Sequence, residues 1–189
     1  MAKRADNVGE TRQRIVEAAM ELHGTVGPAG TTIAGIAERA GVTRLTVYRH
    51  FPDDEALFMA CSSHWESLQQ PPDPGAWARI ADPIERVRFA LTDLYRYYAA
   101  GEGMITLIQR DIEHVPLGRR QVVQARTEAM RALLLEALPK RPRIEAALGH
   151  AMSFATWQSL CRVQRLSNHD AVELMVALVE LTCRRPSPT

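Results

Sequence analysis

Apolar residues recur along this chain every three or four positions, which is the period of an amphipathic α-helix. The pattern continues through most of the 189 residues, and the alternation that marks β-strands is scarce. Two stretches interrupt it, GTVGPAG at residues 24–30 and QQPPDPG at residues 69–75. The pattern therefore predicts an all-α protein with an N-terminal three-helix domain at residues 9–69 and a C-terminal helical bundle at residues 76–185.

The stretch TTIAGIAERAGVTRLTVYRHF, residues 31–51, predicts two short helices joined by a tight turn. Thr31 or Thr32 caps the first helix, since either hydroxyl can accept a bond from an unpaired backbone N–H. Gly41 ends that helix, because a left-handed residue is common at this position. Thr43 caps the second helix, which runs over residues 44–50.

The second short helix has one narrow apolar face and several polar faces. Val47 and Phe51 are four residues apart and form the apolar face. Its polar side chains suit the major groove of DNA, where Arg bonds guanine edges and Tyr or Thr reaches phosphate oxygens. These residues alone fit two interpretations equally well: a DNA-reading helix-turn-helix, or an ordinary helical hairpin with a solvated basic face.

The surrounding residues favour DNA binding. Residues 11–57 resemble the N-terminal domain of the TetR (tetracycline repressor-like) family of bacterial transcription regulators. The matching positions are Ile15, Ala18, Ala19, Leu22, Gly27, Ile36, Ala37, Ala40, Gly41, Val42, Thr43, Val47, Tyr48, His50, Phe51, Glu55 and Leu57. Two positions depart from the family pattern: Asp54 stands where a Lys is usual, and His23 where an aromatic residue is common.

The resemblance implies a dimeric DNA-binding regulator, a repressor that a small-molecule effector releases from a palindromic double-stranded operator. We expect Arg44 and Thr46 to contact bases, with Leu45 touching a thymine methyl group. The DNA backbone would be contacted by a second set, Thr32, Thr43, Tyr48, Arg49 and His50. Asp54 removes one phosphate contact that the family pattern supplies from the following helix.

Charge changes this expectation only in degree. The chain carries a net charge of +1, and residues 1–60 hold one more acidic side chain than basic ones, which is unlike a strongly basic DNA-binding domain. Arg39, Arg44 and Arg49 nevertheless fall in or beside the predicted helix-turn-helix. We therefore expect binding that depends on dimerisation and is readily lost as salt rises.

The other helices are predicted from their caps and breakers. A flexible arm at residues 1–10 precedes a helix over residues 11–23. Asp82-Pro83-Ile84-Glu85 begins a helix that ends near Gly101, and a separate helix follows at residues 104–114. Pro116 opens a helix to Leu138. Two long helices then close the chain, at residues 144–166 and, after the capping residue Ser167, to about residue 184.

We expect the last two helices to form the interface of a homodimer. The candidate interface residues are Ala147, Ala151, Ala155, Ser159, Leu174, Leu178 and Leu181. The first four are small and four residues apart, so that another helix can approach, and the last helix is apolar around most of its girth and must be covered on both sides. The resemblance supports the dimer, and the alternative is that both helices are buried within one monomer.

An effector pocket is expected between helices of the C-terminal bundle. Its candidate lining is Phe89, Tyr95, Tyr98, Met104, Ile108, Trp157 and Gln158, which favours an apolar or aromatic ligand. The alternative for each of these residues is an ordinary place in the core.

No catalytic, cofactor or metal motif appears, so we expect no enzyme activity. Three Cys without a disulfide framework indicate a cytoplasmic protein, and neither a signal peptide nor a membrane-spanning apolar run is expected. Two alternatives stay open: a thiol-based redox sensor on the same DNA-binding frame, and a helical enzyme with a vestigial DNA reader.

Overall fold

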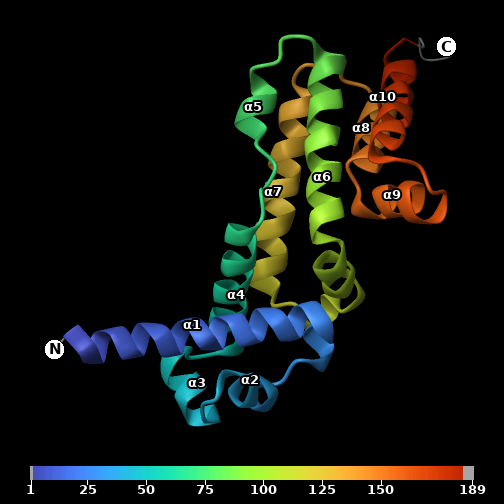
Figure 1. Cartoon of the computed structure of the whole chain (residues 1–189). Coiled ribbons are helices and arrows are strands. Elements are labelled where there is room, and N and C mark those ends of the chain that lie inside the picture. The colour runs from blue at the N-terminus through green and yellow to red at the C-terminus, as the bar shows by residue number, and fades with distance from the viewer. Residues whose placement is uncertain (1, 185–189) are drawn as a thin grey trace. The chain divides into compact units, whose positions relative to one another are not determined.

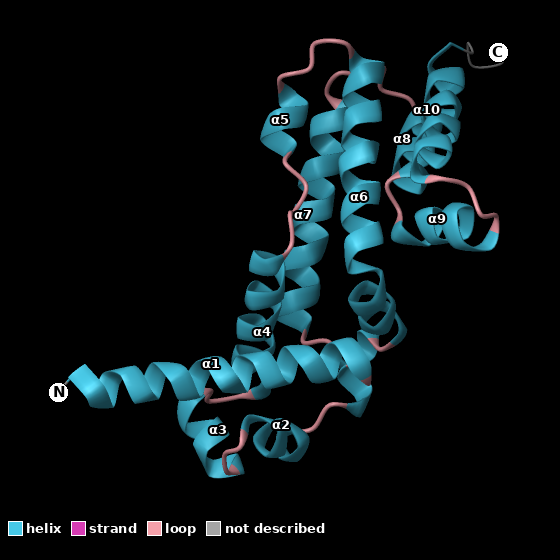
Figure 2. Ribbon diagram, viewed as in Figure 1, coloured by secondary structure: helices cyan, strands magenta, loops and turns pink. Residues whose placement is uncertain are grey.

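A computed structural model describes residues 2–184, with side chains from Val8 onward, and these residues form helices and loops without a strand (Figure 2). The prediction of an all-α protein is confirmed. The helices in chain order are α1 (Ala2–Thr25), α2 (Ile33–Ala40), α3 (Arg44–His50), α4 (Asp54–Leu68), α5 (Pro74–Ala78), α6 (Pro83–Arg110), α7 (Leu117–Leu135), α8 (Pro142–Ala151), α9 (Phe154–Gln158) and α10 (Asn168–Arg184), with shorter turns at η1 (Pro28–Gly30), η2 (Ile112–His114) and the π-helical η3 (Ser159–Val163).

The chain divides into two compact units that do not follow one another in sequence. The first contains the chain up to Gln70 together with Gly101–Val123, and the second contains Pro71–Ala100 together with the residues from Gln124 on. Helices α6 and α7 therefore each have one end in the first unit and the other end in the second. The predicted domains at residues 9–69 and 76–185 remain a prediction, and residue 185 lies outside the described residues.

The core of the first unit forms where α1, α2, α3 and α4 meet (Figure 1). Its buried members are Ile15, Val16, Ala18, Ala19, Ile36, Ala37, Ala40, Val47, Phe51, Leu57 and Cys61. Burying a Val, Ile or Phe side chain contributes about 1.5–3 kcal/mol each. This cluster is therefore what holds the two short helices of the predicted helix-turn-helix in place.

Helix α1 begins earlier than the sequence predicted. The backbone is helical from Ala2, where a flexible arm over residues 1–10 was expected, so that expectation is wrong for the backbone. The helix continues to Thr25, whose hydroxyl donates to the carbonyl of Glu21 at 2.8 Å.

Helix α6 does not end near Gly101. It begins as predicted, with Oδ1 of Asp82 accepting the backbone N–H groups of Ile84 and Glu85 at 2.9 Å, but it runs on to Arg110. A Cβ atom at Gly101 would lie 2.9 Å from Cζ2 of Trp65, so this glycine permits close packing rather than ending a helix. The separate helix predicted at residues 104–114 is therefore wrong.

The proline-rich stretch contains a short helix that the sequence analysis missed. Asp73 caps α5 by accepting the N–H of Ala76 at 3.1 Å, and Pro74 occupies its first turn. Trp77 is fully buried and its Nε1–H donates to Oδ2 of Asp93 on α6 at 3.0 Å. The Asp-Pro signal is the same one that predicted the start of α6.

The single long helix predicted at residues 144–166 is broken in two. The hydroxyl of Tyr95 donates to the carbonyl of Ala151 at 2.9 Å, and that of Tyr98 donates to the carbonyl of Met152 at 2.6 Å. These carbonyls thereby gain partners outside a helix, and the chain turns before α9 begins. In Figure 1, α9 runs across the ends of α8 and α10 instead of continuing α8.

The last helix agrees with its prediction. The N–H of Asp170 donates to Oγ of Ser167 at 3.1 Å, which is the predicted cap, and α10 ends at Arg184. Among the described residues, no helix has the length and hydropathy needed to cross a membrane.

Candidate nucleic-acid interface

The turn between α2 and α3 has the side-chain caps and backbone geometry predicted from the sequence. Oγ1 of Thr32 accepts the N–H of Gly35 at 3.0 Å at the start of α2. Gly41 ends that helix in the left-handed conformation, with φ 66°. Oγ1 of Thr43 then accepts the N–H of Thr46 at 3.2 Å and begins α3. Local hydrogen bonds thus fix both helix starts and the turn between them.

Helix α3 is buried on one face and exposed on the others. Val47 and Phe51 are 1% and 2% exposed, whereas Leu45 and Tyr48 are 79% and 49% exposed. The remaining predicted contacts divide in the same way: Arg44 and Arg49 are exposed, and Thr46 and His50 are half-buried. Val47 and Phe51 therefore pack the helix into the core, while Arg44, Leu45, Tyr48 and Arg49 remain open to a partner.

Two threonines of this face already have hydrogen-bond partners within the chain. The hydroxyls of Thr43 and Thr46 lie 3.0 Å apart, in addition to the cap that Thr43 makes. A hydroxyl carries one donor and two acceptor positions, so each keeps capacity for a further bond. Arg44 and Leu45 extend from the same turn of α3 without such a contact to a described residue.

The basic side chains around α3 differ in their partners. Arg39, on α2, forms an ion pair with Glu21 on α1 and donates through Nε to that carboxylate at 2.8 Å. The pKa of His50 lies below its ordinary value because the ring is partly buried and because Arg49 and Arg12 are near it. Arg39 is therefore neutralised, whereas positive charge gathers at the end of α3.

Arg12 brings part of that charge from α1. Its guanidinium lies over the ring of Phe51, 4.7 Å from the ring centroid. The sequence analysis did not select this residue, because helical periodicity relates neighbours on one helix and gives no signal for a contact between α1 and the end of α3.

The loop between α1 and α2 is held by residues that follow it by more than eighty positions. Oδ2 of Asp111 accepts the N–H of Ala29 at 3.0 Å, and Nη2 of Arg110 donates to the carbonyl of Val26 at 2.8 Å. Gly27 has φ 85°, and a Cβ there would collide with both side chains. Arg110 and Asp111 thus clamp the loop before α2 to the end of α6. Of the residues in this clamp, the sequence analysis identified only Gly27.

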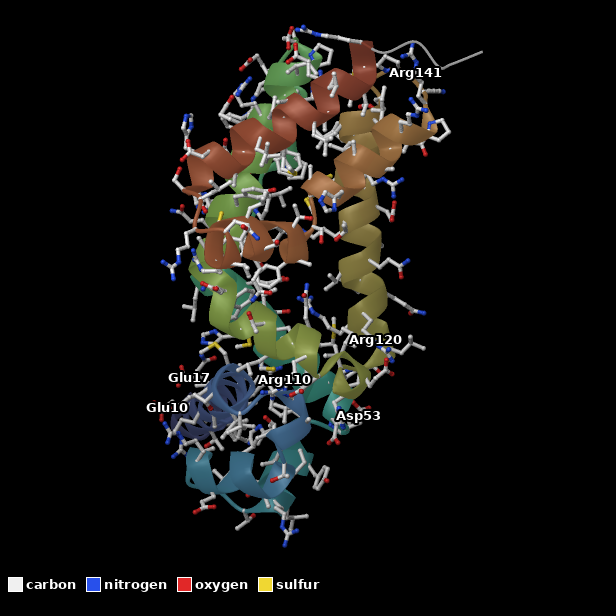
Figure 3. All side chains as sticks on the ribbon, turned by 90° about the vertical axis from the view of Figure 1, so that its right-hand side faces the viewer. Glu10, Glu17, Asp53, Arg110, Arg120 and Arg141 are labelled. Atoms are coloured by element: carbon white, nitrogen blue, oxygen red, sulfur yellow. The ribbon has the colours of Figure 1, made fainter. Side chains whose placement is uncertain are left out.

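The Arg110–Asp111 pair is itself a two-bond ion pair. Nε and Nη2 of Arg110, a residue labelled in Figure 3, donate to the two carboxylate oxygens of Asp111 at 2.7 and 2.8 Å. Hydrogen bonding by Arg110, aided by the N–H of Ala29, holds the pKa of Asp111 down to about 2. The carboxylate is therefore ionised at neutral pH and can keep all of these bonds.

The predicted effector-pocket residues are not all brought together. Tyr95, Tyr98 and Trp157 belong to one aromatic cluster in the second unit, where the rings of Tyr98 and Trp157 lie 6.1 Å apart. Phe154 completes the cluster, at 5.4 Å from Tyr98 and 5.3 Å from Trp157, although it was not predicted. The other predicted members lie elsewhere: Phe89 is 46% exposed, Gln158 is half-buried at the end of α9, and Met104 and Ile108 belong to the first unit.

Hydrogen bonds lock this aromatic cluster into the surrounding helices. Nε1 of Trp157 donates to Oδ1 of Asn168 at 3.0 Å, and the Arg162 guanidinium lies 4.6 Å from the Trp157 ring centroid. Burial raises the pKa of Tyr95 and of Tyr98. Both phenols therefore remain protonated and can donate to the backbone at the break between α8 and α9.

The predicted dimer residues also separate into two groups. Ala147 and Ala151 are buried within the second unit, and Ala155 and Ser159 are exposed on α9 and η3 rather than continuing one stripe. On α10, Leu174 and Leu181 are 48% and 54% exposed, and Leu178 between them is half-buried. These three leucines share one helix face, since their spacing is four and three residues.

The cysteines are placed in ways that oppose thiolate chemistry. Cys61 is buried, with its Sγ 3.3 Å from Nδ1 of His23, and burial raises its pKa to about 12. Cys161 is buried, and burial also raises the pKa of Cys183. Reactive cysteines instead have lowered pKa values in exposed, electropositive surroundings. Within the described part of the chain, no group of three or more His, Cys, Asp or Glu side chains is arranged to hold a metal ion.

Sequence comparisons place the chain among bacterial regulators. A family model described as "Bacterial regulatory proteins, tetR family" matches residues 15–61. The HTH-type transcriptional regulator SrpR of Pseudomonas putida is 32% identical over 126 residues, which cover 65% of this chain but only 57% of SrpR. The uncharacterized HTH-type transcriptional regulator TtgW, also of Pseudomonas putida, is likewise 32% identical over 126 residues, covering 65% of this chain and 91% of TtgW.

Solved structures share the fold at lower sequence identity. A TetR-like transcriptional regulator from Rhodococcus sp. RHA1 has a TM-score of 0.62 and 19% identity, covering 91% of this chain and 94% of that one. NalD, described as the secondary repressor of the MexAB-OprM multidrug efflux pump in Pseudomonas aeruginosa, has a TM-score of 0.58 and 20% identity, covering 96% of this chain and 100% of NalD.

Proposed function

Because this chain belongs to the TetR family of bacterial transcription regulators, we propose that it is a dimeric repressor that a small-molecule effector releases from a palindromic operator. The proposal has three parts, which are operator recognition, dimerisation and release. Repression is carried over from relatives such as NalD, which is described as a repressor.

The observation that carries the proposal is the two-sided character of α3. Val47 and Phe51 anchor the helix in the core of the first unit, while Leu45 at 79% and Tyr48 at 49% exposure face away from that core. A short helix held in this way by a preceding capped helix suits insertion into the major groove. An ordinary hairpin has no need to expose a large leucine beside a tyrosine and two arginines.

Within the groove, each predicted residue has a proposed role. Arg44 bonds a guanine edge, Leu45 packs on a thymine methyl group, and Thr46 bonds a base through its remaining hydrogen-bonding capacity. The backbone set is Thr32, Thr43, Tyr48, Arg49 and His50. Thr32 and Thr43 cap helix starts, where backbone N–H groups also favour a phosphate.

Dimerisation is proposed to use α10. Leu174, Leu178 and Leu181 give that helix an apolar face that is at least partly exposed in the single chain. A twofold axis would pair this face with its copy, which is the commonest symmetry of soluble oligomers. Two α3 helices would then contact half-sites separated by about one helical turn, roughly 34–36 Å.

Release is proposed to begin in the aromatic cluster of the second unit. An apolar or aromatic effector would compete with the ring contacts of Tyr98 and Trp157 and thereby shift α6, on which Tyr98 lies. Helix α6 continues to Arg110, and the clamp at Arg110 and Asp111 holds the loop that precedes α2. The effector favours release if it binds better to the state that fits the operator poorly.

The operator proposal is tested by fluorescence anisotropy with a duplex from the DNA upstream of this protein's own gene, at two salt concentrations. The unchanged chain should bind this duplex more tightly than a mixed-sequence duplex of equal length. Arg44→Ala should lose about 1–3 kcal/mol of discrimination at one base pair of each half-site. Tyr48→Phe should weaken binding to both duplexes alike, since a phosphate contact carries no sequence information.

Two results would contradict this assignment. The proposal of operator recognition would be wrong if the chain bound both duplexes equally and also selected no sequence from a randomised library. If Arg44→Ala instead lowered the affinity for both duplexes equally, Arg44 would contact the DNA backbone and not a base. The release step is tested separately: a bound effector that leaves operator affinity unchanged is uncoupled, because linkage between two ligands is reciprocal.

A further inference from the structure

Three nitrogen-bearing side chains from two helices lie at or beside the C-terminal end of α3. Arg49 and His50 are the last two residues of that helix, and Arg12 reaches the same place from α1. The Arg12 guanidinium is fixed there by its position over the Phe51 ring, 4.7 Å from the centroid. Phe51 follows His50 directly and is 2% exposed, so this contact has a rigid base.

The lowered pKa of His50 agrees with a position of its ring near both arginines. Partial burial of the ring is the largest cause of its lowered pKa, and the positive charges of Arg49 and Arg12 are the next two. A cation can lower the pKa of a histidine only at short range, because charges in protein surroundings are screened over about 8–10 Å at ordinary salt.

No described carboxylate is paired with these two arginines. Neither Arg12 nor Arg49 forms a salt bridge with any residue whose side chain the structure describes, whereas Arg39 in the same unit is paired with Glu21. Asp53 is the acid that follows Arg49 most closely in sequence, and its Oδ1 accepts the N–H of Ala56 at 2.7 Å as the cap of α4.

The two described acids of α1 nearest to Arg12 in sequence do not share its helix face. Glu10 and Glu17 are two and five positions from Arg12, so neither lies on its helix face at a spacing of three or four residues. Glu17 accepts the side-chain amide of Gln13 at 2.9 Å. In Figure 3, Glu10 and Glu17 are labelled on one side of the first unit and Asp53 on the other.

The start of α4 carries acidic side chains and no basic ones. Asp53 and Asp54 occupy that position, and Asp54 stands where the resemblance to the family leads one to expect Lys. A helix in the major groove has its ends near the phosphates that border the groove, and phosphate contacts set its register. A cation cluster at the end of α3 is therefore placed where an anion of the DNA backbone would pass.

We infer that Arg12, Arg49 and His50 form one phosphate-binding cluster, in which Arg12 on α1 supplies the charge that α4 lacks. The inference rests on the proposed function and adds to it Arg12, a residue outside the helix-turn-helix. The cluster binds a backbone phosphate of duplex DNA irrespective of sequence, and it orients α3 in the groove. Arg12 and Arg49 contribute charge, and His50 contributes a ring N–H donor.

The test measures how the binding constant of the full chain depends on salt. The probes are a mixed-sequence 40-base-pair duplex and a duplex selected from a randomised library with the same protein. Each phosphate contact contributes about 0.9 to the slope of log K against log salt concentration. Arg12→Met keeps an apolar side chain on Phe51 and removes the charge, Arg12→Lys keeps the charge, and Arg39→Gln removes an equal charge from a guanidinium that Glu21 already neutralises.

We expect Arg12→Met to lower the slope by about 0.9 per bound subunit on both duplexes, and Arg12→Lys and Arg39→Gln to leave it nearly unchanged. A folded Arg12→Met variant with the full slope overturns the inference, because Arg12 would then serve only to cover Phe51. An equal loss in Arg39→Gln also overturns it, because the effect would be one of net charge.

The two levels of the proposal fail in distinguishable ways. If Arg12→Met does not fold, as judged by circular dichroism, Arg49→Gln takes its place in the comparison, and a full slope in that variant overturns the cluster. If the unchanged chain binds neither duplex, the proposed function fails and the inference falls with it. If the unchanged chain binds and a folded Arg12→Met variant, or Arg49→Gln in its place, keeps the full slope, the inference alone is overturned.

Discussion

The backbone N–H of Ala29 donates to Oδ2 of Asp111 at 3.0 Å, although 82 positions separate the two residues in sequence. This bond, with the ion pair from Arg110, holds the loop before α2. Asp111→Ala should therefore lower the thermal unfolding midpoint, because it leaves the Ala29 N–H and the guanidinium without this carboxylate. Glu113→Ala is the control, because it removes a carboxylate from a weak surface ion pair. Glu113 is 83% exposed, and its Oε2 lies 3.8 Å from Nη1 of Arg120. Equal midpoints for the two variants, measured by circular dichroism, would show that the clamp contributes nothing to stability.

The same pair predicts a pH dependence at the acidic end. The pKa of Asp111 is lowered to about 2, chiefly by the hydrogen bonds from Arg110. A carboxyl whose pKa is lowered by folding stabilises the folded state above its unfolded value of about 3.9, and that contribution is lost as the pH falls toward 2. Unfolding midpoints of the unchanged chain and Asp111→Ala should therefore converge over this range. A constant difference between them down to pH 2 would contradict the assignment.

Two neighbouring positions on α3 should separate DNA binding from stability. Val47 is 1% exposed and Leu45 is 79% exposed. Val47→Ala should lower the free energy of unfolding by about 2 kcal/mol, since it removes buried apolar surface, and should weaken DNA binding only through the loss of folded protein. Leu45→Ala should change stability by less than about 0.5 kcal/mol but weaken binding to the selected duplex. Urea unfolding and anisotropy on the same preparations check both, and a Leu45→Ala variant with unchanged affinity would remove the thymine-methyl contact.

The part of the fold around α3 could be predicted because its causes are local. Thr32, Gly41 and Thr43 act on backbone groups within a few residues of themselves, and the apolar positions repeat at the helical period. The predicted bounds of this region therefore agree with the structure. The same holds for Asp82 before α6 and Ser167 before α10, whose caps are also local.

The mistaken boundaries have causes that lie far away in the sequence. In the sequence, Gly101 suggests the end of a helix, but in the structure the ring of Trp65 packs against this glycine within α6. The break after α8 depends on the hydroxyls of Tyr95 and Tyr98, more than fifty positions earlier. For the same reason the stripe of small residues was interpreted as one interface, and the aromatic residues as one pocket. Contacts between distant segments overrule helical periodicity at such points.

His23 should make the stability of the first unit depend on pH. Its ring is 7% exposed and packs 4.6 Å from the Phe58 ring, and burial lowers its pKa from 6.5 to about 4. Between these values the unfolded chain binds a proton that the folded chain does not. The contribution of His23 is therefore complete above pH 6.5 and declines as the pH falls toward 4, by about 3 kcal/mol in all.

Urea unfolding at several pH values tests this linkage. Acidic groups titrate in the lower part of the same range, so the informative quantity is the difference between variants. His23→Phe should flatten the dependence between pH 6.5 and 4, whereas His169→Gln, an exposed substitution on α10, should leave it intact. Parallel curves for the unchanged chain and His23→Phe would mean that the folded protein accepts the proton on His23.

The exposed leucines of α10 should decide the oligomeric state. Leu174 and Leu181 are 48% and 54% exposed, and their helix face is the proposed contact between two copies. Replacing both with Glu should yield a monomer by sedimentation velocity, because paired carboxylates cannot be buried across a twofold axis without a large cost. Leu68→Glu is the matched control, since Leu68 is 61% exposed at the end of α4. Should the double variant sediment as a dimer, the interface lies elsewhere. A monomer can contact only one half-site at a time, whereas a dimer contacts both at once. If the double variant is monomeric, its affinity for the selected duplex should therefore fall toward its affinity for mixed-sequence DNA.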